Sequence, residues 1–197
     1  MKAAWTKKIT LVRFNNTLSV IIVMLSVYIF VWPFMPRLTF WWHMYTDKTN
    51  GYTYQNRIES TNTTKPIPQD NRLVIPGLHM DEAIHDGPTV ATLSQGAWRR
   101  PQTSTPDKGG NTVIAGHRFT YRESAVFYNL DKVQKNDPII VYWEGKEYDY
   151  IVDEVAVVRP TAVEIESPTP DSRLTIYTCT PLWTAKDRLV VKARLIQ

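Results

Sequence analysis

The stretch PIIVYWEGKEYDYIV, from Pro138 to Val152, decides the fold class. Two runs rich in Val, Ile and Tyr stand on either side of the dipeptide Glu144-Gly145. β-Branched and aromatic residues favour strands, and a short glycine-containing turn between two such runs is typical of a β-hairpin. We therefore expect two strands, Pro138–Trp143 and Lys146–Val158, joined by a tight turn.

Similar runs lie on both sides of this hairpin, separated by Pro, Gly, Asp and Asn. The other expected strands are Arg72–Ile75, Asn111–Gly116, Leu174–Thr178 and Arg188–Ile196. One short helix is expected around Ser124–Leu130, and the polar stretch LHMDEAIHDG has helical or irregular spacing. Many short strands with one or two short helices predict an all-β domain, either a sandwich or a closed barrel.

An apolar segment precedes this domain. Residues Thr17 to Pro36 form a run of twenty without a charge. As a helix the run would cover about 30 Å, the hydrocarbon thickness of a bilayer. A cleaved secretory signal is the alternative, but the run is longer than a typical signal core and no Ala-x-Ala-like site follows it. Basic residues before the run and aromatic residues after it predict a retained single-pass anchor with a cytoplasmic N-terminus.

The chain is therefore expected to have four parts. Residues 1–16 form a basic cytoplasmic segment, and residues 17–36 form the transmembrane anchor in the plasma membrane. Residues 37–71 form a polar extracytoplasmic linker, rich in Thr and Asn. Residues 72–197 have the size of one domain with one core.

The formal net charge of +4 belongs to the anchor region. All 19 acidic residues lie after Arg37, and five of the 23 basic residues lie at or before it, so the exported part has 18 basic against 19 acidic residues, a net charge of −1. Nucleic-acid binding requires a basic stripe on the folded domain. The charge distribution therefore gives no support to a nucleic acid as partner.

The run LTIYTC ends in Cys179, the only cysteine of the chain. Structural cysteines outside the cytoplasm usually come in pairs, so a lone exported thiol is either buried in the core or has a task. Strand alternation places Leu174, Ile176 and Thr178 on one face and Cys179 on the other. Cys179 thus leaves the core face as the strand ends, which predicts an accessible thiol.

A nucleophilic thiol needs help from its surroundings. An ordinary cysteine, with a pKa of about 8.5, is only a few per cent thiolate at neutral pH, so a base, a cation or both must lie nearby. His117 emerges at the end of an apolar strand that glycines flank, whereas His79 and His85 are typical of polar loop residues. Arg188 opens the last strand, where an arginine is usually a solvated surface residue.

The segments GGNTVIAGHR, LTIYTC and RLVV together resemble a sortase, one of the membrane-anchored cysteine transpeptidases that join secreted proteins to cell-wall or pilus amines. The family's signature Thr-Leu-x-Thr-Cys is similar to residues 175–179, with Ile in place of Leu. The family's histidine follows a glycine, as His117 does, and its arginine opens the strand after the cysteine, as Arg188 does. The resemblance spans about Leu73 to Ala193.

The resemblance implies a closed eight-stranded β-barrel in which His117, Cys179 and Arg188 line one groove. The Cys179 thiolate would attack the Thr–Gly carbonyl of a signal resembling Leu-Pro-x-Thr-Gly, as in cysteine peptidases. His117 would move protons and Arg188 would stabilise the oxyanion. The implied partners are secreted proteins with such a C-terminal signal, and an amine from a peptidoglycan precursor or a pilin lysine. No cofactor is implied.

The resemblance also suggests six substrate contacts, three before the signature, one in it and two after it. They are Ala162, Val163, Ile165, Thr178, Leu182 and Trp183. Ordinary loop packing is the alternative for the first three, and a cap over the core for the last two. Calcium would require a cluster such as Glu164, Glu166 and Asp171, and we expect no metal because scattered loop acids are usually solvated.

The subclass follows from what the chain lacks. No second membrane segment follows the last strand, and the linker has no Asp-Pro-aromatic lid, both of which are typical of class C sortases. Residues 159–173 are too few for the helical insertion of class B. The expected resemblance is therefore to classes A, D or E, and either surface-protein anchoring or pilus assembly remains open.

Three alternatives remain from the sequence. A tethered β-barrel that binds peptides or glycans would make Cys179 incidental. An L,D-transpeptidase would act on peptidoglycan stems, but those enzymes usually place histidine and cysteine in one cluster, whereas His117 and Cys179 lie on separate strands. A catalytically degenerate sortase would keep the fold without the activity.

Overall fold

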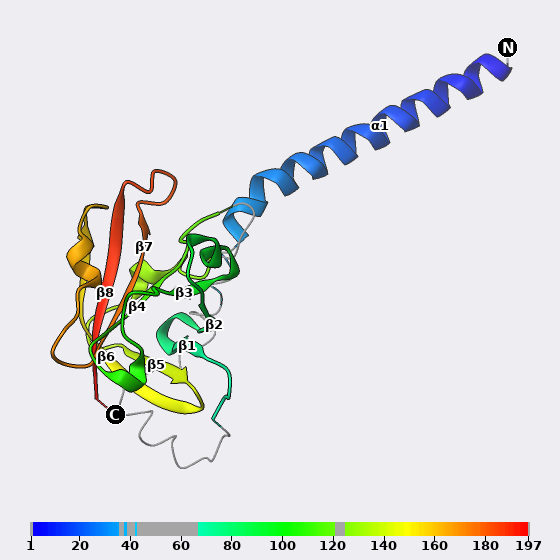
Figure 1. The fold of residues 1–197 in the computed structure, drawn as a ribbon. Coiled ribbons are helices and arrows are strands. Elements are labelled where there is room, and N and C mark those ends of the chain that lie inside the picture. Colours follow the sequence, from blue (N-terminus) through cyan, green and yellow to red (C-terminus); the bar gives the residue numbers. More distant parts are fainter. Residues whose placement is uncertain (1, 36–37, 39–41, 43–66, 121–124, 197) are drawn as a thin grey trace. The chain divides into compact units, whose positions relative to one another are not determined.

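The computed structural model of the chain describes residues 2–35, 38, 42, 67–120 and 125–196 (Figure 1). The chain divides into two compact units, Met1–Asn50 and Gly51–Gln197. Most of the linker predicted at residues 37–71 lies outside the described residues.

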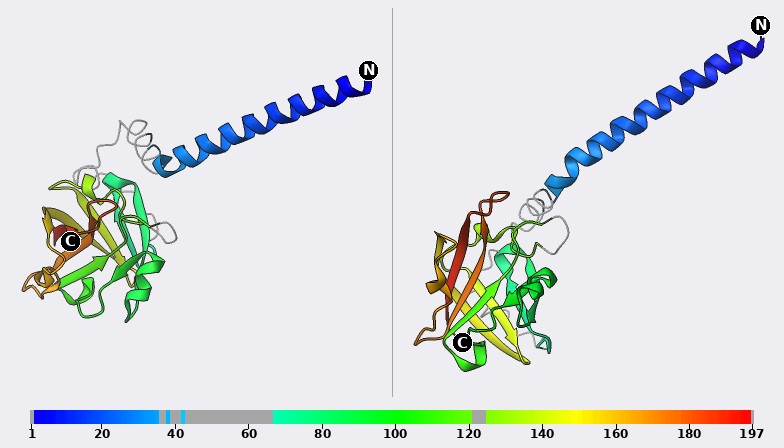
Figure 2. Two further views of the ribbon diagram at one scale, coloured as in Figure 1. Left: turned by 90° about the horizontal axis from the view of Figure 1, so that it is seen from above. Right: turned by 45° about the horizontal axis from the view of Figure 1, so that its top comes forward.

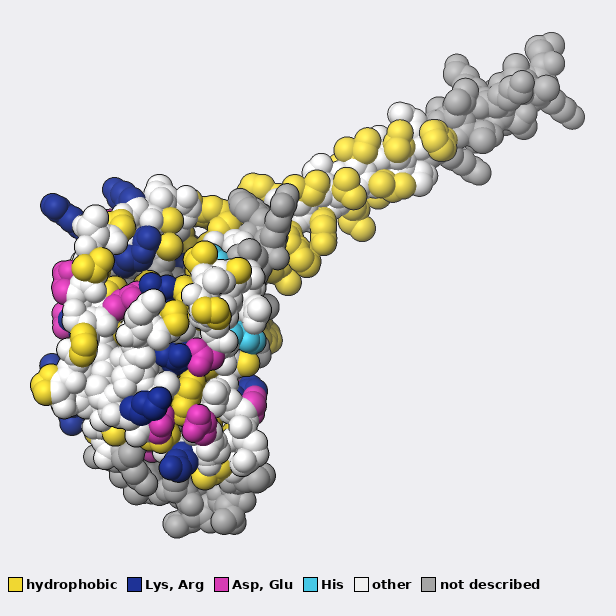
Figure 3. All heavy atoms as spheres, viewed as in Figure 1, with side chains coloured by type: hydrophobic (Ala, Val, Ile, Leu, Met, Phe, Trp, Pro, Cys, Tyr) yellow, Lys and Arg dark blue, Asp and Glu magenta, His cyan; other side chains and the backbone are white. Residues whose placement is uncertain are grey.

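The first unit contains one long helix, α1, from Lys2 to Val31, followed by a short 3-10 helix, η1, at Trp32–Phe34. Its segment Phe14–Val31 has a mean hydropathy of 1.9 and none of it is buried. Hydrophobic side chains cover the visible side of this segment in Figure 3. By length and composition the helix is therefore able to cross a membrane, as the sequence predicts, while the limits 17–36 and the cytoplasmic N-terminus remain predictions.

The second unit is a closed β-barrel, which confirms the predicted fold class (Figures 1 and 2). Its strands follow one another around the barrel in the order β1-β2-β3-β4-β7-β8-β6-β5. The strands are β1 Arg72–Ile75, β2 Met80–Asp86, β3 Ala97–Arg99, β4 Asn111–Ala115, β5 Pro138–Trp143, β6 Lys146–Val158, β7 Arg173–Thr180 and β8 Asp187–Leu195. Short 3-10 helices lie between them: η2 Pro76–Leu78, η3 Val90–Gln95, η4 Pro106–Lys108, η5 Leu130–Lys132 and η6 Val163–Glu166.

The hairpin that decides the fold class has the predicted strands and turn. β5 pairs antiparallel with β6 from Pro138↔Ile151 to Trp143↔Lys146. The turn residues Glu144 and Gly145 have φ angles of 49° and 71°. Left-handed backbone at both turn positions matches the twist of the flanking strands, which explains the glycine there.

Two neighbouring pairs in the barrel are parallel, β2 with β3 and β4 with β7. Alternate side chains of the strands fill the interior, and the largest fully buried aliphatic ones include Leu73, Ile114 and Ile176. Trp98 also belongs to the core, since it is only 3% exposed. All five residues of β4 are buried, so both faces of this strand are covered.

Strands β2 and β3 were not predicted from the sequence. The stretch that was expected to be helical or irregular forms β2, whose two buried apolar residues, Met80 and Ile84, are four apart. Four-residue spacing is also typical of one helix face, so the pattern misleads. β3 has only three residues, too few for a periodic signal, and it is fixed by parallel pairing with β2.

The helix predicted at Ser124–Leu130 is also wrong. Ser124 itself lies outside the described residues, and the rest of the segment forms no α-helix. Residues 126–129 form turns, and a 3-10 helix follows at η5. The Phe127 N–H donates to the His117 carbonyl at 3.0 Å, a partner outside the segment. This bond uses a backbone donor that a helix would have needed, and it fixes the turn beside the end of β4.

Candidate active site

The three predicted catalytic residues form one row, with Cys179 on β7, Arg188 on β8 and His117 two residues beyond the end of β4. Cys179 and Arg188 are direct partners in the antiparallel β7–β8 pair. Directly paired residues place their side chains on the same face of a sheet, with Cβ atoms about 5 Å apart. We call the face of β4, β7 and β8 that carries Cys179 and Arg188 the site face.

His117 reaches this row from the parallel β4–β7 pair. The register ends at Ala115↔Tyr177, and the Gly116 N–H donates to the Tyr177 carbonyl at 3.3 Å. Extending this register by two residues beyond Ala115 brings His117 level with Cys179, and continuing the strand period of two then places His117 on the site face. Residues separated by 62 positions in the chain thus become neighbours, with Arg188 on the opposite side of the cysteine.

Burial agrees with the predicted alternation along β7. Leu174, Ile176 and Thr178 are buried on the core face, whereas Cys179 is half-buried and carries a free thiol. His117 and Arg188 are half-buried as well. The thiol is therefore partly accessible and does not serve as core filler.

Hydrogen bonds and packing fix the end of β4 near His117. The Thr178 hydroxyl donates to the Gly116 carbonyl at 2.7 Å. A Cβ at Gly116 would lie 2.4 Å from the buried ring of Phe127, so only glycine allows this close approach. The glycine before the histidine thus has a packing role that the sequence motif alone does not reveal.

The Arg188 guanidinium forms no ion pair with a carboxylate of the described residues. Its Nη1 donates to the carbonyls of Ala185 and Asp187, at 3.2 and 3.0 Å. Its Nε and Nη2 make no hydrogen bond to the described residues. A guanidinium held in this way, with two donor groups unbonded among the described residues, is suited to bind a carbonyl oxygen or an oxyanion.

The β6–β7 loop, residues 159–172, is fastened to the site face by Asn111. The Asn111 amide donates to the carbonyls of Ile165 and Ser167, both at 3.0 Å. Its carbonyl oxygen accepts a hydrogen bond of 2.8 Å from the Thr175 hydroxyl. Asn111 is 4% exposed, so the loop explains why β4 is buried on both faces.

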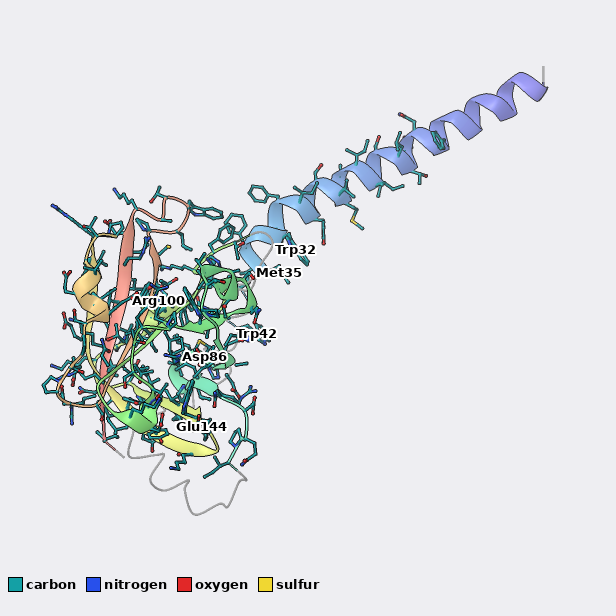
Figure 4. The ribbon with its side chains drawn as sticks, viewed as in Figure 1. Trp32, Met35, Trp42, Asp86, Arg100 and Glu144 are labelled. Atoms are coloured by element: carbon teal, nitrogen blue, oxygen red, sulfur yellow. The ribbon has the colours of Figure 1, made fainter. Side chains whose placement is uncertain are left out.

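A second attachment of this loop lies closer to the cysteine. Glu166 accepts hydrogen bonds from the Tyr177 hydroxyl at 2.7 Å and from the Arg100 Nε at 2.9 Å. The Arg100 guanidinium, labelled in Figure 4, stacks on the Trp98 ring at 4.5 Å. Burial, with the bond to Glu166, raises the pKa of Tyr177, so the phenol stays protonated and donates. The sequence gives no signal for these partners.

The six predicted substrate contacts lie in the two loops on either side of the row, except for Thr178. Ala162 and Ile165 are half-buried and Val163 is 79% exposed, and all three belong to η6 or its N-cap. Thr178 is buried, and its hydroxyl is bonded to the Gly116 carbonyl within the barrel.

The other two predicted contacts lie in the β7–β8 loop, residues 181–186. Leu182 is half-buried and Trp183 is 64% exposed. The Trp183 ring contacts Phe119, with centroids 4.4 Å apart and planes tilted by 55°. This pair connects the loop after Cys179 with the segment after His117.

Two further features lie away from the row. A cavity of about 230 Å³ is bordered by β2 residues, by the 125–129 turn and by His79, and by none of the three predicted catalytic residues. Among the described residues no group of three His, Cys, Asp or Glu side chains is placed to hold a metal ion. Of the acids considered for calcium, Glu166 pairs with Arg100 and Asp171 with Arg173.

Comparison with known proteins gives one consistent family. The model of the sortase domain matches residues 73–196. Sortase SrtE2 of Streptomyces coelicolor is 28% identical over 166 residues, covering 73% of this chain and 64% of that protein. Sortase SrtE1 of the same organism is 32% identical over 106 residues, covering 49% of this chain and 30% of that protein. The chain thus spans less than two thirds of the length of these relatives.

Solved structures agree with the sequence comparison. The sortase D5 transpeptidase of Clostridium perfringens is similar with a TM-score of 0.59 at 27% identity, covering 75% of this chain and 91% of that one. The matched family domain includes the eight strands, except for the first residue of β1, and all three residues of the row. On these grounds the chain belongs to the sortase family.

Proposed function

We propose that the chain is a membrane-anchored cysteine transpeptidase that cleaves a sorting signal similar to Leu-Pro-x-Thr-Gly and transfers the acyl part to an amine. The observation that carries the proposal is the row in which Cys179 has Arg188 as its direct partner on β8 and His117 level with it beyond β4. A nucleophile, a proton carrier and a fixed cation on one face are the groups that acyl transfer requires.

In the first half of the reaction the Cys179 thiolate attacks the Thr–Gly carbonyl carbon of the signal. The carbonyl becomes an oxyanion beside the Nε and Nη2 donors of Arg188. The C–N bond then breaks, the imidazolium of His117 gives a proton to the leaving glycine amine, and a thioester to Cys179 remains.

In the second half an incoming amine attacks the thioester carbonyl. Neutral His117 accepts the proton that the amine loses, and Arg188 again stabilises the oxyanion. The C–S bond breaks, Cys179 leaves as a thiolate, and a new amide joins the signal-bearing protein to the acceptor. The His117 imidazolium and the thiolate are thereby restored.

The surroundings of the row support a peptide as substrate. The β6–β7 loop holds Ala162 and Ile165 half-buried and Val163 exposed beside the site face, so apolar groups are available for the first residues of a signal. Trp183 and Leu182 border the row on the side of the β7–β8 loop. The acceptor would be an amine of a peptidoglycan precursor or of a pilin lysine.

The helix α1 supports a role at the cell surface. We infer that residues 17–36 anchor the chain in the plasma membrane, with residues 1–16 in the cytoplasm and the barrel, residues 72–197, outside. Residues 37–71 would then form the tether between them. Secreted proteins held at the same membrane would be within reach of the barrel.

The test uses the full-length chain in detergent micelles with a panel of fluorogenic peptides resembling Leu-Pro-x-Thr-Gly and an amine acceptor. Cys179→Ala should abolish transfer, and His117→Ala should lower kcat by about a hundredfold or more. Arg188→Lys should lower kcat by about a hundredfold, because it keeps the charge but loses the fork of donors. His85→Ala and Arg194→Lys are matched controls outside the row, since Arg194 pairs with Asp153 on the outer barrel.

The alternatives make different predictions in the same assay. A peptide-binding barrel would bind the panel without turnover, and Cys179→Ala would bind as well as the wild type. An L,D-transpeptidase would turn over peptidoglycan stem peptides and leave the panel intact. A degenerate sortase would bind the panel, but neither the wild type nor any variant would turn it over.

A further inference from the structure

Behind the row of His117, Cys179 and Arg188 lies a cluster of polar side chains that the mechanism above does not use. We call Arg118, Thr180 and Asp131 the buried arginine cluster. Arg118 is 7% exposed, although arginine is almost never fully buried without partners. Thr180 is 9% exposed.

Two members of the cluster are chain neighbours of the reacting groups. Arg118 follows His117, and Thr180 follows Cys179. The period of two in an extended chain places Thr180 on the face opposite to Cys179, where it is buried. The same two chain segments thus supply residues to the row and, at the next position along each segment, to the buried arginine cluster.

The bonds of Arg118 join these segments across the gap between them. Its Nη1 donates to the Thr180 hydroxyl at 2.6 Å, and its Nη2 forms an ion pair with Asp131 at 3.0 Å. Its Nε donates to the Tyr128 carbonyl at 3.5 Å. The guanidinium therefore connects the segment after β4, the end of β7 and the turn before η5.

These bonds begin where the backbone ladder stops. The paired register of β4 and β7 ends at Ala115↔Tyr177, so no paired backbone positions fix His117 against Cys179. The Thr178 hydroxyl bonds to the Gly116 carbonyl one step before the row, and Arg118 bonds to Thr180 one step after it. The row therefore lies between two side-chain hydrogen bonds, one on each side, that join the segment after β4 to the end of β7.

We propose that Arg118 is a positioning residue that sets the spacing between His117 and Cys179 through its bond to Thr180. The inference rests on the proposed function, in which His117 exchanges protons at the cysteine. A planar guanidinium with several donors in one plane holds three acceptors at fixed angles, which a flexible ammonium does not do. Because Arg118 is only 7% exposed, its expected role is to position other groups and not to touch the substrate.

The test removes the hydroxyl of Thr180 that accepts the hydrogen bond from Arg118 and keeps the shape of the side chain. Thr180→Val keeps the volume of the side chain but removes the hydroxyl that Arg118 binds, whereas Thr180→Ser keeps the hydroxyl and loses only a methyl group. Thr112→Val is the matched control, because the buried Thr112 hydroxyl has no hydrogen-bond partner among the described residues. All variants are made in the full-length chain in detergent, and their thermal unfolding is compared with the wild type.

We expect Thr180→Val to lower kcat for peptide transfer by about tenfold to a hundredfold with KM within about twofold, as for a misplaced reacting group. Thr180→Ser and Thr112→Val should keep kcat within about threefold of the wild type. A Thr180→Val enzyme with wild-type kcat and wild-type folding would overturn the proposal.

A second readout does not depend on the peptide. The rate of Cys179 alkylation by iodoacetamide is measured against pH, with His117→Ala as reference. Thr180→Val should move the profile of the wild type toward that of His117→Ala, while Thr180→Ser and Thr112→Val leave it in place. A profile that responds to His117→Ala but not to Thr180→Val would overturn the positioning role.

The two readouts also separate this inference from the proposed function. If the wild type transfers no peptide but Thr180→Val and His117→Ala shift the alkylation profile alike, the positioning role is supported and the transpeptidase proposal fails. If Thr180→Val does not fold, Arg118→Lys replaces it. A folded Arg118→Lys enzyme that equals the wild type in both readouts would then overturn the inference.

Discussion

The two sides of Cys179 are built differently. On the β8 side the backbone ladder continues past the cysteine, from Cys179↔Arg188 to Thr180↔Asp187. On the β4 side the paired ladder ends at Ala115↔Tyr177, before His117 is reached. Side-chain bonds and the packing of Phe127 on Gly116 take its place there.

This difference between the two sides predicts which substitutions will lower stability and activity. Backbone hydrogen bonds do not depend on residue type, so apart from Arg188 the β8 side should tolerate changes that leave the strand extended. The β4 side depends on a few side chains and on one glycine, and each should be sensitive. The following substitutions test this contrast, from the largest expected effect to the smallest.

The largest effect is expected for Gly116→Ala. The added methyl would lie 2.4 Å from Phe127 Cδ2 and 2.8 Å from Val126 Cγ2, and the Phe127 ring is fully buried. We expect a loss of about 3 kcal/mol in the free energy of unfolding, as for overpacking of a core, with displacement of His117 and loss of activity. Urea unfolding measures the first and peptide transfer the second.

Gly77→Ala is the matched control, because its Cβ would meet only Asp137 at 3.8 Å. It should leave stability and activity within the error of measurement, or stabilise slightly by restricting the unfolded chain. Equal stability of the two alanine variants would show that Phe127 does not restrict position 116.

The second effect concerns the loop on the β4 side. Asn111→Asp replaces the amide that donates to Ile165 and Ser167 by an oxygen that repels both carbonyls. We expect a loss of about 2 kcal/mol in unfolding free energy and a higher KM for peptides, because the β6–β7 loop loses its attachment. The exposed Asn136→Asp is the control, and a wild-type KM for Asn111→Asp would argue against the loop as a substrate contact.

A smaller effect is expected for Tyr177→Phe, which removes only the hydroxyl bonded to Glu166. The carboxylate keeps its ion pair with Arg100, so the loss should be about 1 kcal/mol in unfolding free energy. Tyr148→Phe is the control, since that hydroxyl makes no hydrogen bond to the described residues. If both variants unfold at the same urea concentration, the hydrogen bond from Tyr177 to Glu166 does not contribute to the free energy of unfolding.

The smallest effect belongs to the β8 side. Lys192→Gln removes an exposed ion pair with Glu154 across β8 and β6, on the same face of β8 as Arg188. Such a pair contributes about 0.5 kcal/mol or less. Unfolding and peptide transfer should both remain close to wild type, and a large loss would mean that the β8 ladder is less robust than proposed.

Much of the fold could be predicted because its main signals are local. The β5–β6 hairpin carries β-branched runs and a turn glycine, and its strand limits agree with those observed. β2 and β3 could not be predicted, because β2 has a misleading four-residue spacing and β3 is defined by its neighbours. The helix expected before η5 fails for a similar reason, since the bond of Phe127 to His117 is tertiary.

The same distinction holds for the site. Cys179 could be singled out because alternation and its position at a strand end are visible in the sequence. Asn111, Glu166 and Arg118 could not, because their partners lie 54 to 66 residues away or in another loop. Basic and acidic side chains are interspersed on the visible face of the barrel, in agreement with the near-neutral charge balance of residues 38–197 (Figure 3).

The most direct measurement of the central claim is the intact mass of the full-length protein after incubation with peptides resembling Leu-Pro-x-Thr-Gly. The account predicts an added mass equal to the acyl part of the peptide, which is absent in Cys179→Ala and is lost when an amine is added. An adduct that persists in Cys179→Ala would contradict the account. So would the absence of any adduct on a protein whose Cys179 is readily alkylated by iodoacetamide.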